Sequence, residues 1–480
     1  MADAGFATGD LGLAAYQFVD FLNHVGASVW QTLPINMPHA DNSPYQCVSA
    51  FAGNHKFISL EKLVEQGLLL DSDLICSNLT ANHSSQHKTS LLKKAYSHFQ
   101  LDGSQALKLS FTSFRRKNSH WLNDYALFCI LREQHHFTCW NAWPKKYRDR
   151  DPEALKAFKK EHADALSLVK FTQFCFFEQW HALKNYANQH GVALFGDIPI
   201  FVAYDSADVW AHPELFKLNK QKKMIVVAGV PPDYFSATGQ RWGNPHYNWP
   251  KMRENYFKWW VSRMATQNAL FDLVRIDHFR GLEAAWEIPA TEPTAMNGTW
   301  VTAPGDALLR KLTRTFPESI LIAEDLGVIT PEVTALKDKY ALPGMKILHF
   351  AFGGQEDNPY LPQHITPNSV AYTGTHDNDT SLGWYLALPQ HEKNNLHGYL
   401  QTDTPNMPYA LNQLALSTNA NLVIIPMQDI LGLDGTHRMN TPGTSEGNWH
   451  WRFEWGQLQA IHSRQFAEAV AASGRVVLTN

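Results

Sequence analysis

The chain has 480 residues, 41 Lys and Arg against 45 Asp and Glu, a formal net charge of −4, and 44% hydrophobic residues. This length allows a large buried core, and it is as compatible with one barrel carrying long insertions as with two or three domains. Charges of both signs alternate without long runs. We therefore exclude the strongly basic surface that a nucleic-acid or membrane-surface partner would require.

The five cysteines stand far apart, and neither a CxxC pair nor a Cys/His spacing typical of a metal site links them. We expect reduced, buried thiols, a cytoplasmic location, and no metal or cofactor. The first residues lack the basic and apolar regions of a secretory signal. No apolar stretch is long enough to span a bilayer.

Seven short apolar runs, separated by helical patterns, predict the strands of a parallel sheet. They lie at 27–33, 192–197, 272–277, 319–324, 345–350, 370–376 and 421–425. Strands that alternate with amphipathic helices favour a parallel sheet covered on both faces. Several runs end in Asp, Glu or His. This one-sided clustering favours a (β/α)8 TIM-type barrel over a doubly wound sheet, whose site lies at a single crevice.

A barrel of this type needs eight strands, and the sequence shows seven. The first recognisable element is a helix at 14–21, with nothing strand-like before it. Either one strand escapes recognition, or the first barrel strand is missing at the N-terminus. A barrel that is open at one seam would expose strand edges and lose core area.

We expect a single catalytic barrel over 1–480 with three interruptions. The largest is a mainly helical insertion at 60–190, where Leu, Lys, Phe, Trp and His recur at three- and four-residue spacing. A loop region rich in Gly and Pro follows at 210–250, and a smaller insertion lies at 283–318.

A further amphipathic helix is expected from Glu254 to Leu270. Its large apolar residues fit core packing better than a ligand platform; they are Tyr256, Trp259, Trp260 and Met264.

Three carboxylates, Asp277, Glu324 and Asp377, each follow an apolar strand. In an α/β barrel, the carboxyl ends of the strands are where active sites lie. Unpaired acidic side chains gathered there are costly to stability unless they do chemistry. An acid and a carboxylate are also the minimum equipment for cleaving a glycosidic bond.

The neighbours of two acids suggest different roles. Arg275 and Asp277 point to the same side of a strand, and a guanidinium stabilises the ionised carboxylate that a nucleophile requires. Taken alone, a structural ion pair is at least as good an interpretation. Close carboxylates and restricted water would raise the pKa of Glu324, so that it could act as a general acid. The alternative is that Glu324 accepts backbone hydrogen bonds at a helix N-terminus.

Two rival chemistries have weaker support. The pair His376 and Asp377 could suggest a serine-type relay, but no Gly-x-Ser-x-Gly elbow supplies a nucleophile. A metal site would be the other rival, and the sequence lacks HExxH and closely spaced His pairs.

Three segments combine aromatic residues with Gly, Pro and amide side chains, at 42–46, 229–245 and 440–452. Pyranose rings stack on aromatic faces, and their hydroxyls need hydrogen-bonding partners. The segment at 229–245 therefore suits a lid or binding rim. Taken singly, each segment is explained more simply as a structured turn.

Together these segments resemble glycoside hydrolase family 77, the 4-α-glucanotransferases known as amylomaltases or disproportionating enzymes, within the α-amylase superfamily. The resemblance covers almost the whole chain, from Thr8 to Arg452. Its most specific segments are 43–46, 229–236, 275–278, 323–327 and 375–378. Members of this family usually begin with an apolar strand and a Leu-Pro-Gly turn. Here seven residues precede the matching segment, in line with the strand that we did not find.

The resemblance implies that Asp277 is the nucleophile, Glu324 the acid/base and Asp377 the transition-state stabiliser. It also implies that the glucan is bound by Ser43, Tyr45, Asp233, Tyr234, Phe235, Trp242, Asn244, Arg275, His376 and Asn448. Among these, Arg275 and His376 would hold the sugar beside the cleaved bond, with Tyr45 stacking against it. Residues 233–235 would arch over the glucan, and Trp242 would flank it.

The activity implied is the retaining transfer of α-1,4-glucan segments between malto-oligosaccharides or starch- or glycogen-type glucans, without a cofactor or metal. The carboxyl groups of Asp277 and Glu324 should then lie about 5–5.5 Å apart. Two alternatives stay open, an α-amylase-like retaining hydrolase and a catalytically inactive glucan-binding protein.

Overall fold

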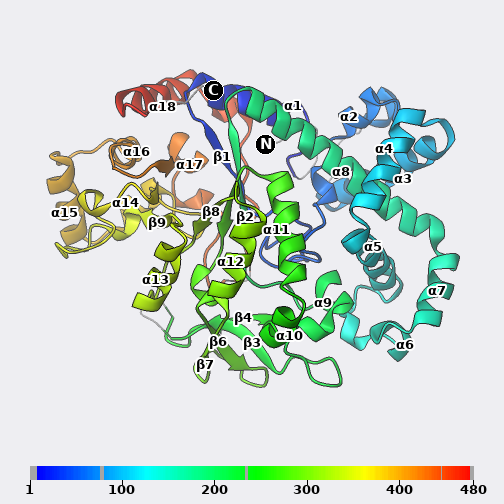
Figure 1. Ribbon diagram of the computed structural model, residues 1–480. Coiled ribbons are helices and arrows are strands. Elements are labelled where there is room, and N and C mark those ends of the chain that lie inside the picture. Colours follow the sequence, from blue (N-terminus) through cyan, green and yellow to red (C-terminus); the bar gives the residue numbers. More distant parts are fainter. Residues whose placement is uncertain (1–7, 76–80, 233–235, 445, 476–480) are drawn as a thin grey trace.

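The computed structural model describes residues 8–75, 81–232, 236–444 and 446–475 (Figure 1). Seven parallel strands form two sheets, in the orders β1-β2-β5-β8 and β9-β10-β11. They are β1 (Val29–Gln31), β2 (Ala193–Ile198), β5 (Leu273–Ile276), β8 (Ile320–Ala323), β9 (Gly344–Ile347), β10 (Ser369–Tyr372) and β11 (Leu422–Ile424). All seven lie at the predicted runs, and those predictions are confirmed.

The two parallel sheets continue each other around the barrel. The Ala323 N–H at the end of β8 donates to the Pro343 carbonyl before β9 at 2.9 Å. The Met345 N–H donates to the Asp325 carboxylate at 2.7 Å. The Asp325 side chain thus binds the backbone of β9 at the point where main-chain pairing between β8 and β9 ends. The fold is the predicted α/β barrel type with large helical insertions.

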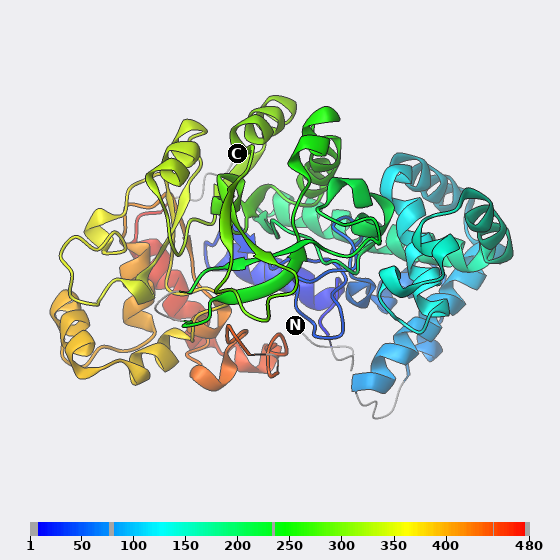
Figure 2. The same ribbon diagram turned by 90° about the horizontal axis from the view of Figure 1, so that it is seen from below.

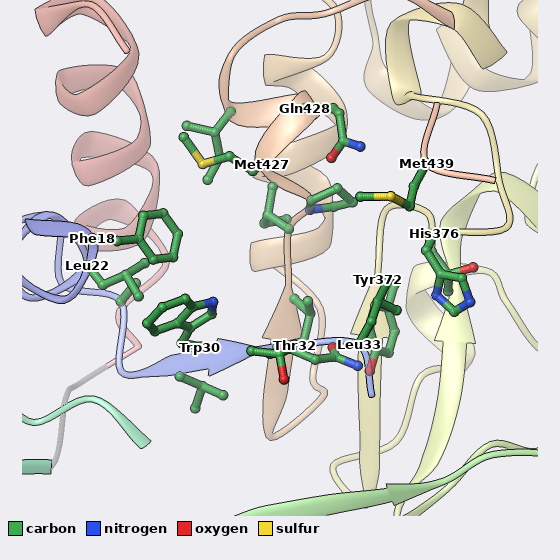
Figure 3. A pocket seen from close by; sticks show the side chains of 18 of the residues that line it. Phe18, Leu22, Trp30, Thr32, Leu33, Tyr372, His376, Met427, Gln428 and Met439 are labelled. Atoms are coloured by element: carbon green, nitrogen blue, oxygen red, sulfur yellow. The ribbon is translucent and has the colours of Figure 1, made fainter. Parts of the chain in front are cut away.

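The barrel has an open seam between β1 and β11. Each of these strands pairs on one side only, and no other described strand lies between them. A cavity of about 1410 Å³ occupies the seam, lined by both strands and by apolar side chains of the outer helices. Figure 3 shows Phe18, Leu22 and Trp30 on one side of it and Tyr372 on the other. Within the described part of the chain, β1 and β11 therefore each present one unpaired edge.

All the described regular elements between residues 60 and 190 are helices, and they lie to one side of the barrel (Figures 1 and 2). Its helices are α2 (Leu60–Glu65), α3 (Ala81–Asp102), α4 (Gln105–Lys117), α5 (Ser119–Gln134), α6 (Lys145–Arg148), α7 (Pro152–Glu161) and α8 (Ala163–Gln189). Side-chain caps begin three of them, with Ser59 accepting from the Lys62 N–H, Ser104 from the Leu107 N–H and Asp151 from the Ala154 N–H. The region's division into a subdomain stays a prediction.

A small antiparallel sheet, in the order β4-β3-β6-β7, lies apart from the parallel strands. Its strands are β3 (Val226–Val230), β4 (Gln240–Pro245), β6 (Ala284–Pro289) and β7 (Thr299–Thr302). The prediction of a loop throughout 229–245 is therefore wrong at both ends of that segment. A Cβ on Gly229 would lie 2.1 Å from the Gln240 carbonyl oxygen, so this glycine permits close pairing of strands rather than a loop. Asp233, Tyr234 and Phe235 lie outside the described residues.

The predicted helix from Glu254 to Leu270 is also wrong at its start. Helix α10 (Trp249–Glu254) ends there, and α11 (Lys258–Leu270) begins after a break. Tyr256 and Phe257 adopt left-handed backbone angles, with φ of 56° and 57°. The side chain of Asn255 accepts from the Lys258 N–H and restarts the helix. Tyr256 is exposed, contrary to prediction, whereas the predicted core residues Trp259, Trp260 and Met264 are buried.

The remaining helices cover the barrel or connect its strands. They are α1 (Leu13–His24), α9 (Ala207–Ala211), α12 (Gly305–Thr315), α13 (Pro331–Lys339), α14 (Ser381–Ala387), α15 (Gln390–Leu400), α16 (Tyr409–Leu416), α17 (Met427–Ile430) and α18 (Ala460–Ala472). The helix predicted at 14–21 is confirmed as α1. Among the described residues, no helix combines the length and apolar character needed to cross a membrane.

Candidate active site

Asp277 and Glu324 stand on neighbouring strands, each at the residue that follows its strand. Ile276 of β5 is in register with Ala323 of β8. The Asp277 N–H donates to the Ile198 carbonyl at 3.0 Å, and the Glu324 N–H donates to the Ile276 carbonyl at 3.0 Å. Backbone pairing therefore places these two carboxylates side by side at the carboxyl edge of the barrel.

Arg275 supplies the positive charge among the carboxylates. Its buried guanidinium donates from two nitrogens to Asp197, at 2.9 and 2.6 Å, and lies 3.4 Å from the Asp277 carboxylate. The predicted neighbourhood of Arg275 and Asp277 is thus present, but the closer partner is Asp197. Asp197 ends the predicted run 192–197, and the sequence does not indicate its place in the site. Among the described residues, no cluster of three or more His, Cys, Asp and Glu side chains is arranged to hold a metal ion.

Tyr45 connects this arginine to the loop that carries His376 and Asp377. The Tyr45 hydroxyl donates to Asp197 at 2.7 Å and accepts from Arg275 at 2.9 Å. His376 Nε2 lies 3.0 Å from the same hydroxyl, and the two rings stack with their centroids 5.4 Å apart. Since the Tyr45 hydroxyl donates its proton to Asp197, it must accept from His376. We therefore assign the imidazole proton of His376 to Nε2. Burial lowers the pKa of His376, so the imidazole is neutral near pH 7.

Asp377 is the most open of the three acids, with a side chain 50% exposed. Asn440 donates from Nδ2 to its carboxylate at 2.6 Å, and Arg438 donates to its main-chain carbonyl at 3.1 Å. The Asn440 N–H also donates to the His376 carbonyl at 3.1 Å. The segment 438–440 therefore holds Asp377. We had interpreted Asn440 only as part of an aromatic rim and had not considered Arg438.

Two backbone donors hold the Glu324 carboxylate. It accepts from the His278 N–H at 2.7 Å and from the Leu326 N–H at 2.9 Å. The alternative interpretation of Glu324, a carboxylate bound to backbone N–H groups, is therefore present in the structure. These bonds lower its pKa, but burial outweighs them and raises the pKa of Glu324 to about 7.

Burial also raises the pKa of Asp277. Arg275 opposes the shift, while the charges of Asp197, Glu324 and Asp377 add to it. The two adjacent acids thus compete for one proton. Because the guanidinium is in ion-pair contact with Asp277, we assign the negative charge to Asp277 and the proton to Glu324.

Trp242 packs beside the residue that follows Asp277, and its predicted place at the flank of a bound glucan stays a prediction. Its ring meets the ring of His278, the residue after Asp277, at a centroid distance of 4.8 Å and nearly at right angles. Its Nε1 donates to the side chain of Gln240 at 3.1 Å. A second indole, that of Trp449, lies near Tyr45, with the two ring centroids 6.0 Å apart.

The side chains of three predicted glucan-binding residues form hydrogen bonds within the protein. The Ser43 hydroxyl accepts from the Tyr45 N–H at 3.4 Å. Buried Asn244 accepts from Gln46 at 3.0 Å and donates to a main-chain carbonyl at 3.0 Å. Asn448 accepts from the Thr441 N–H at 2.9 Å. These contacts shape the loops around the site, and direct contact of the three side chains with a substrate stays a prediction.

The cavity in the barrel seam reaches this site, because Arg275 and His376 are among its lining residues. Figure 3 shows His376 at one end of the cavity, with Met439 and Gln428 nearby. Asp277 and Glu324 are not part of its lining. The open seam therefore borders the His376 side of the site and leaves the strand-paired acids on the other side.

Comparison with known proteins gives a consistent result. Residues 2–459 match the glycoside hydrolase family 77, described as 4-alpha-glucanotransferase. The 4-alpha-glucanotransferase of Thermus thermophilus is 44% identical over 481 residues, which cover 98% of this chain and 96% of that protein. The 4-alpha-glucanotransferase of a Synechocystis strain is 45% identical over 463 residues, covering 94% of this chain and 92% of that protein.

Solved structures agree with these sequence matches. The amylomaltase from Streptococcus agalactiae, in complex with acarbose, superimposes with a TM-score of 0.93 at 33% identity, covering 97% of this chain and 96% of that one. The amylomaltase from Corynebacterium glutamicum has a TM-score of 0.73 at 18% identity, covering 96% of this chain and 72% of that one. The second match concerns the fold alone.

Proposed function

The chain belongs to the 4-alpha-glucanotransferase family, and from this premise we propose that Asp277, Glu324 and Asp377 carry out a retaining transfer of α-1,4-glucan segments. The observation that carries the assignment of residues is the pairing of β5 and β8, which sets Asp277 beside Glu324. Arg275, Tyr45 and His376 link this pair to Asp377 through the contacts described above.

In the first step, Asp277 attacks the anomeric carbon of the donor sugar while Glu324 protonates the leaving glycosidic oxygen. The assignment of the proton to Glu324 and of the charge to Asp277 supports this division of roles. To present its proton to a substrate, the Glu324 carboxyl must give up one of the backbone N–H donors that hold it, from His278 or Leu326.

In the second step, Glu324 has become a base. It removes the proton from the 4-hydroxyl of an acceptor sugar, whose oxygen displaces Asp277 from the anomeric carbon. Asp377 binds ring hydroxyls more strongly in the oxocarbenium-like transition state than in the ground state. The retaining course requires the carboxyl groups of Asp277 and Glu324 to lie about 5–5.5 Å apart, which stays a prediction.

The substrates that we propose are malto-oligosaccharides and starch- or glycogen-type α-glucans. The acarbose complex of the Streptococcus agalactiae amylomaltase supports this class of ligand. Tyr45, Trp242 and Trp449 provide aromatic faces near the acids, and pyranose rings pack against such faces. We also propose a cytoplasmic location, which the four free cysteines of the described residues support.

Product analysis on maltotriose tests the function. A transferase converts maltotriose into glucose and chains longer than the substrate. An α-amylase-like hydrolase yields only chains shorter than the substrate, and an inactive binding protein leaves maltotriose unchanged. Either of these last two results would contradict the proposal. The Asp277→Asn variant serves as the control for contaminating activity.

A further inference from the structure

The loop between β10 and α14, which carries His376 and Asp377, is tied at both ends to one buried carboxylate. This is Asp429 of α17, which is 2% exposed. The Thr373 hydroxyl, at the start of the loop, donates to its Oδ2 at 2.7 Å. At the far end, the Ser381 hydroxyl donates to Oδ2 at 2.6 Å and the Ser381 N–H to Oδ1 at 2.8 Å.

His349 adds a further hydrogen bond to Ser381 at the far end of the loop. Its Nε2 lies 3.0 Å from the Ser381 hydroxyl oxygen. Because Ser381 gives its single hydroxyl proton to Asp429, His349 must be the donor. Burial lowers the pKa of His349 to about 3, so the ring is neutral and carries its proton on Nε2. The ring also stacks on Trp384 of α14, with the centroids 4.4 Å apart.

The same ring supports the loop backbone. A Cβ on Gly374 would lie 2.7 Å from His349 Cε1, so the main chain of the loop passes directly over the imidazole. The His349 N–H donates to the Thr373 carbonyl at 3.1 Å. The loop therefore rests on His349 along its first residues, in addition to the bonds at its two ends.

Helix α17 also contacts the second segment that holds Asp377. Gln428, the residue before Asp429, donates to the His437 carbonyl at 3.3 Å. His437 precedes Arg438 and Asn440, which bind the main chain and the carboxylate of Asp377. One short helix thus connects both segments that fix the position of this acid.

We propose that Asp429 is a positioning residue, which sets the place of Asp377 by anchoring both ends of the loop that carries it. The inference rests on the proposed function of Asp377. A carboxylate suits this position because it only accepts hydrogen bonds, and the three groups around it all donate. An amide of the same shape would offer one acceptor oxygen and turn an N–H₂ group toward a donor.

Steady-state kinetics of Asp429→Asn, alone and combined with Asp377→Asn, test the proposal. In the wild-type background we expect kcat to fall by about tenfold to a hundredfold while KM changes by less than about threefold, since Asp377 acts mainly in the transition state. In the Asp377→Asn background we expect almost no further loss in kcat, because the carboxylate that Asp429 positions has already been removed. Equal fold losses in both backgrounds, or no loss in either, would overturn the proposal.

A matched control separates positioning from general destabilisation. Asp272 also accepts a backbone N–H, from Leu194 at 2.8 Å, but lies at the opposite end of the strands. Asp272→Asn should lower Tm and leave kcat unchanged. If Asp429→Asn does not fold, the isosteric Thr373→Val removes one anchor bond and enters the same double-mutant comparison.

The outcomes for the two proposals are distinguishable. If Asp377→Asn alone leaves kcat unchanged, the proposed role of Asp377 fails, and the inference fails with it. If Asp377→Asn lowers kcat but the effects of the two substitutions multiply, only the positioning role of Asp429 is overturned.

Discussion

The two sides of the active site are built by different means. On one side, β2, β5 and β8 form a continuous parallel ladder, and backbone hydrogen bonds place Asp277 and Glu324. On the other side, Asp377 lies in a loop near the open seam, and side chains hold it. Figure 1 shows the paired strands at the centre of the molecule, with the chain carrying α14 to α17 beside them.

The comparison indicates which interactions fix the positions of the acids on each side of the site. A strand ladder fixes a side chain through many cooperative backbone bonds, so no single neighbour is essential. A loop beside an unpaired edge has no ladder, and each of its few side-chain bonds carries more of the positioning. Substitutions of supporting residues should therefore affect kcat more on the Asp377 side than on the paired side.

The largest effect is expected for Asp277→Asn, on the paired side. The amide cannot form the glucosyl-enzyme, so kcat should fall on the order of 10⁴-fold or more. Arg275 remains paired with Asp197, so the fold and the affinity for maltotriose should persist. Product analysis and calorimetric titration measure the two quantities. A variant that keeps more than a tenth of the activity would show that Asp277 is not the nucleophile.

The next effect concerns Glu324 and pH. Its pKa of about 7 keeps the acid protonated below neutrality, so kcat/KM should decline as the pH rises above about 7. Glu324→Gln should lower kcat by about 10²- to 10⁴-fold and remove this decline. A pH profile of both proteins checks the prediction, and an unchanged alkaline limb in the variant would assign it to another group.

The same group links pH to stability. The folded-state pKa of Glu324 is raised above its unfolded value, so its contribution is present at low pH and is lost as the pH rises through about 7. Gln is neutral at every pH. Its amide can accept from only one of the two backbone N–H donors, and this loss does not depend on pH. The Tm of the Glu324→Gln variant relative to the wild type should therefore rise between pH 5 and pH 8.

A smaller effect is expected for Asn440→Ala, on the loop side. Removing a hydrogen bond to a carboxylate costs about 1.5–3 kcal/mol, so kcat should fall by about tenfold to a hundredfold. KM should change little. Asn395→Ala is the control, because Asn395 donates to a main-chain carbonyl far from the acids in the chain. Equal kinetics for the two variants would refute the claim that side chains position Asp377.

A last pair of substitutions, which should leave kcat nearly unchanged, compares the two sides by stability alone. Ile322 of β8 is 1% exposed, and its change to Ala should cost about 2–5 kcal/mol. Ile424 of β11 lines the seam cavity and is less buried, so the same change should cost about 1 kcal/mol. Urea unfolding measures both. A larger loss at Ile424 would show that the seam is as tightly packed as the paired side.

The sequence predicted the seven parallel strands because each is a short apolar run between helical patterns, and several of these runs end in Asp, Glu or His. It did not predict the break at Tyr256 and Phe257, since neither is a glycine and the left-handed turn is stabilised by contacts within the fold. The role of Asp197 depends on its register opposite Arg275 across β2 and β5. Such a register is a tertiary property, and no spacing along the chain encodes it.

The residues of the candidate site also divide into those that the sequence could indicate and those that depend on the tertiary structure. Asp277, Glu324 and Asp377 were recognisable because each follows a strand and lies in a segment specific to the family. Asn440 could not be recognised as a partner of Asp377, because two loops far apart in the sequence must meet to bring them together. Asp429 lies just beyond the last predicted strand, and nothing in the sequence indicates its anchoring bonds, because they depend on the packing of α17.

Trapping the covalent intermediate tests the central claim most directly. Glu324→Gln would be incubated with α-maltosyl fluoride, whose leaving group needs no protonation, and then digested for peptide mass spectrometry. The account predicts a maltosyl group on the peptide that contains Asp277, attached to that carboxylate. A maltosyl group on another residue, or a first product of inverted anomeric configuration, would contradict it.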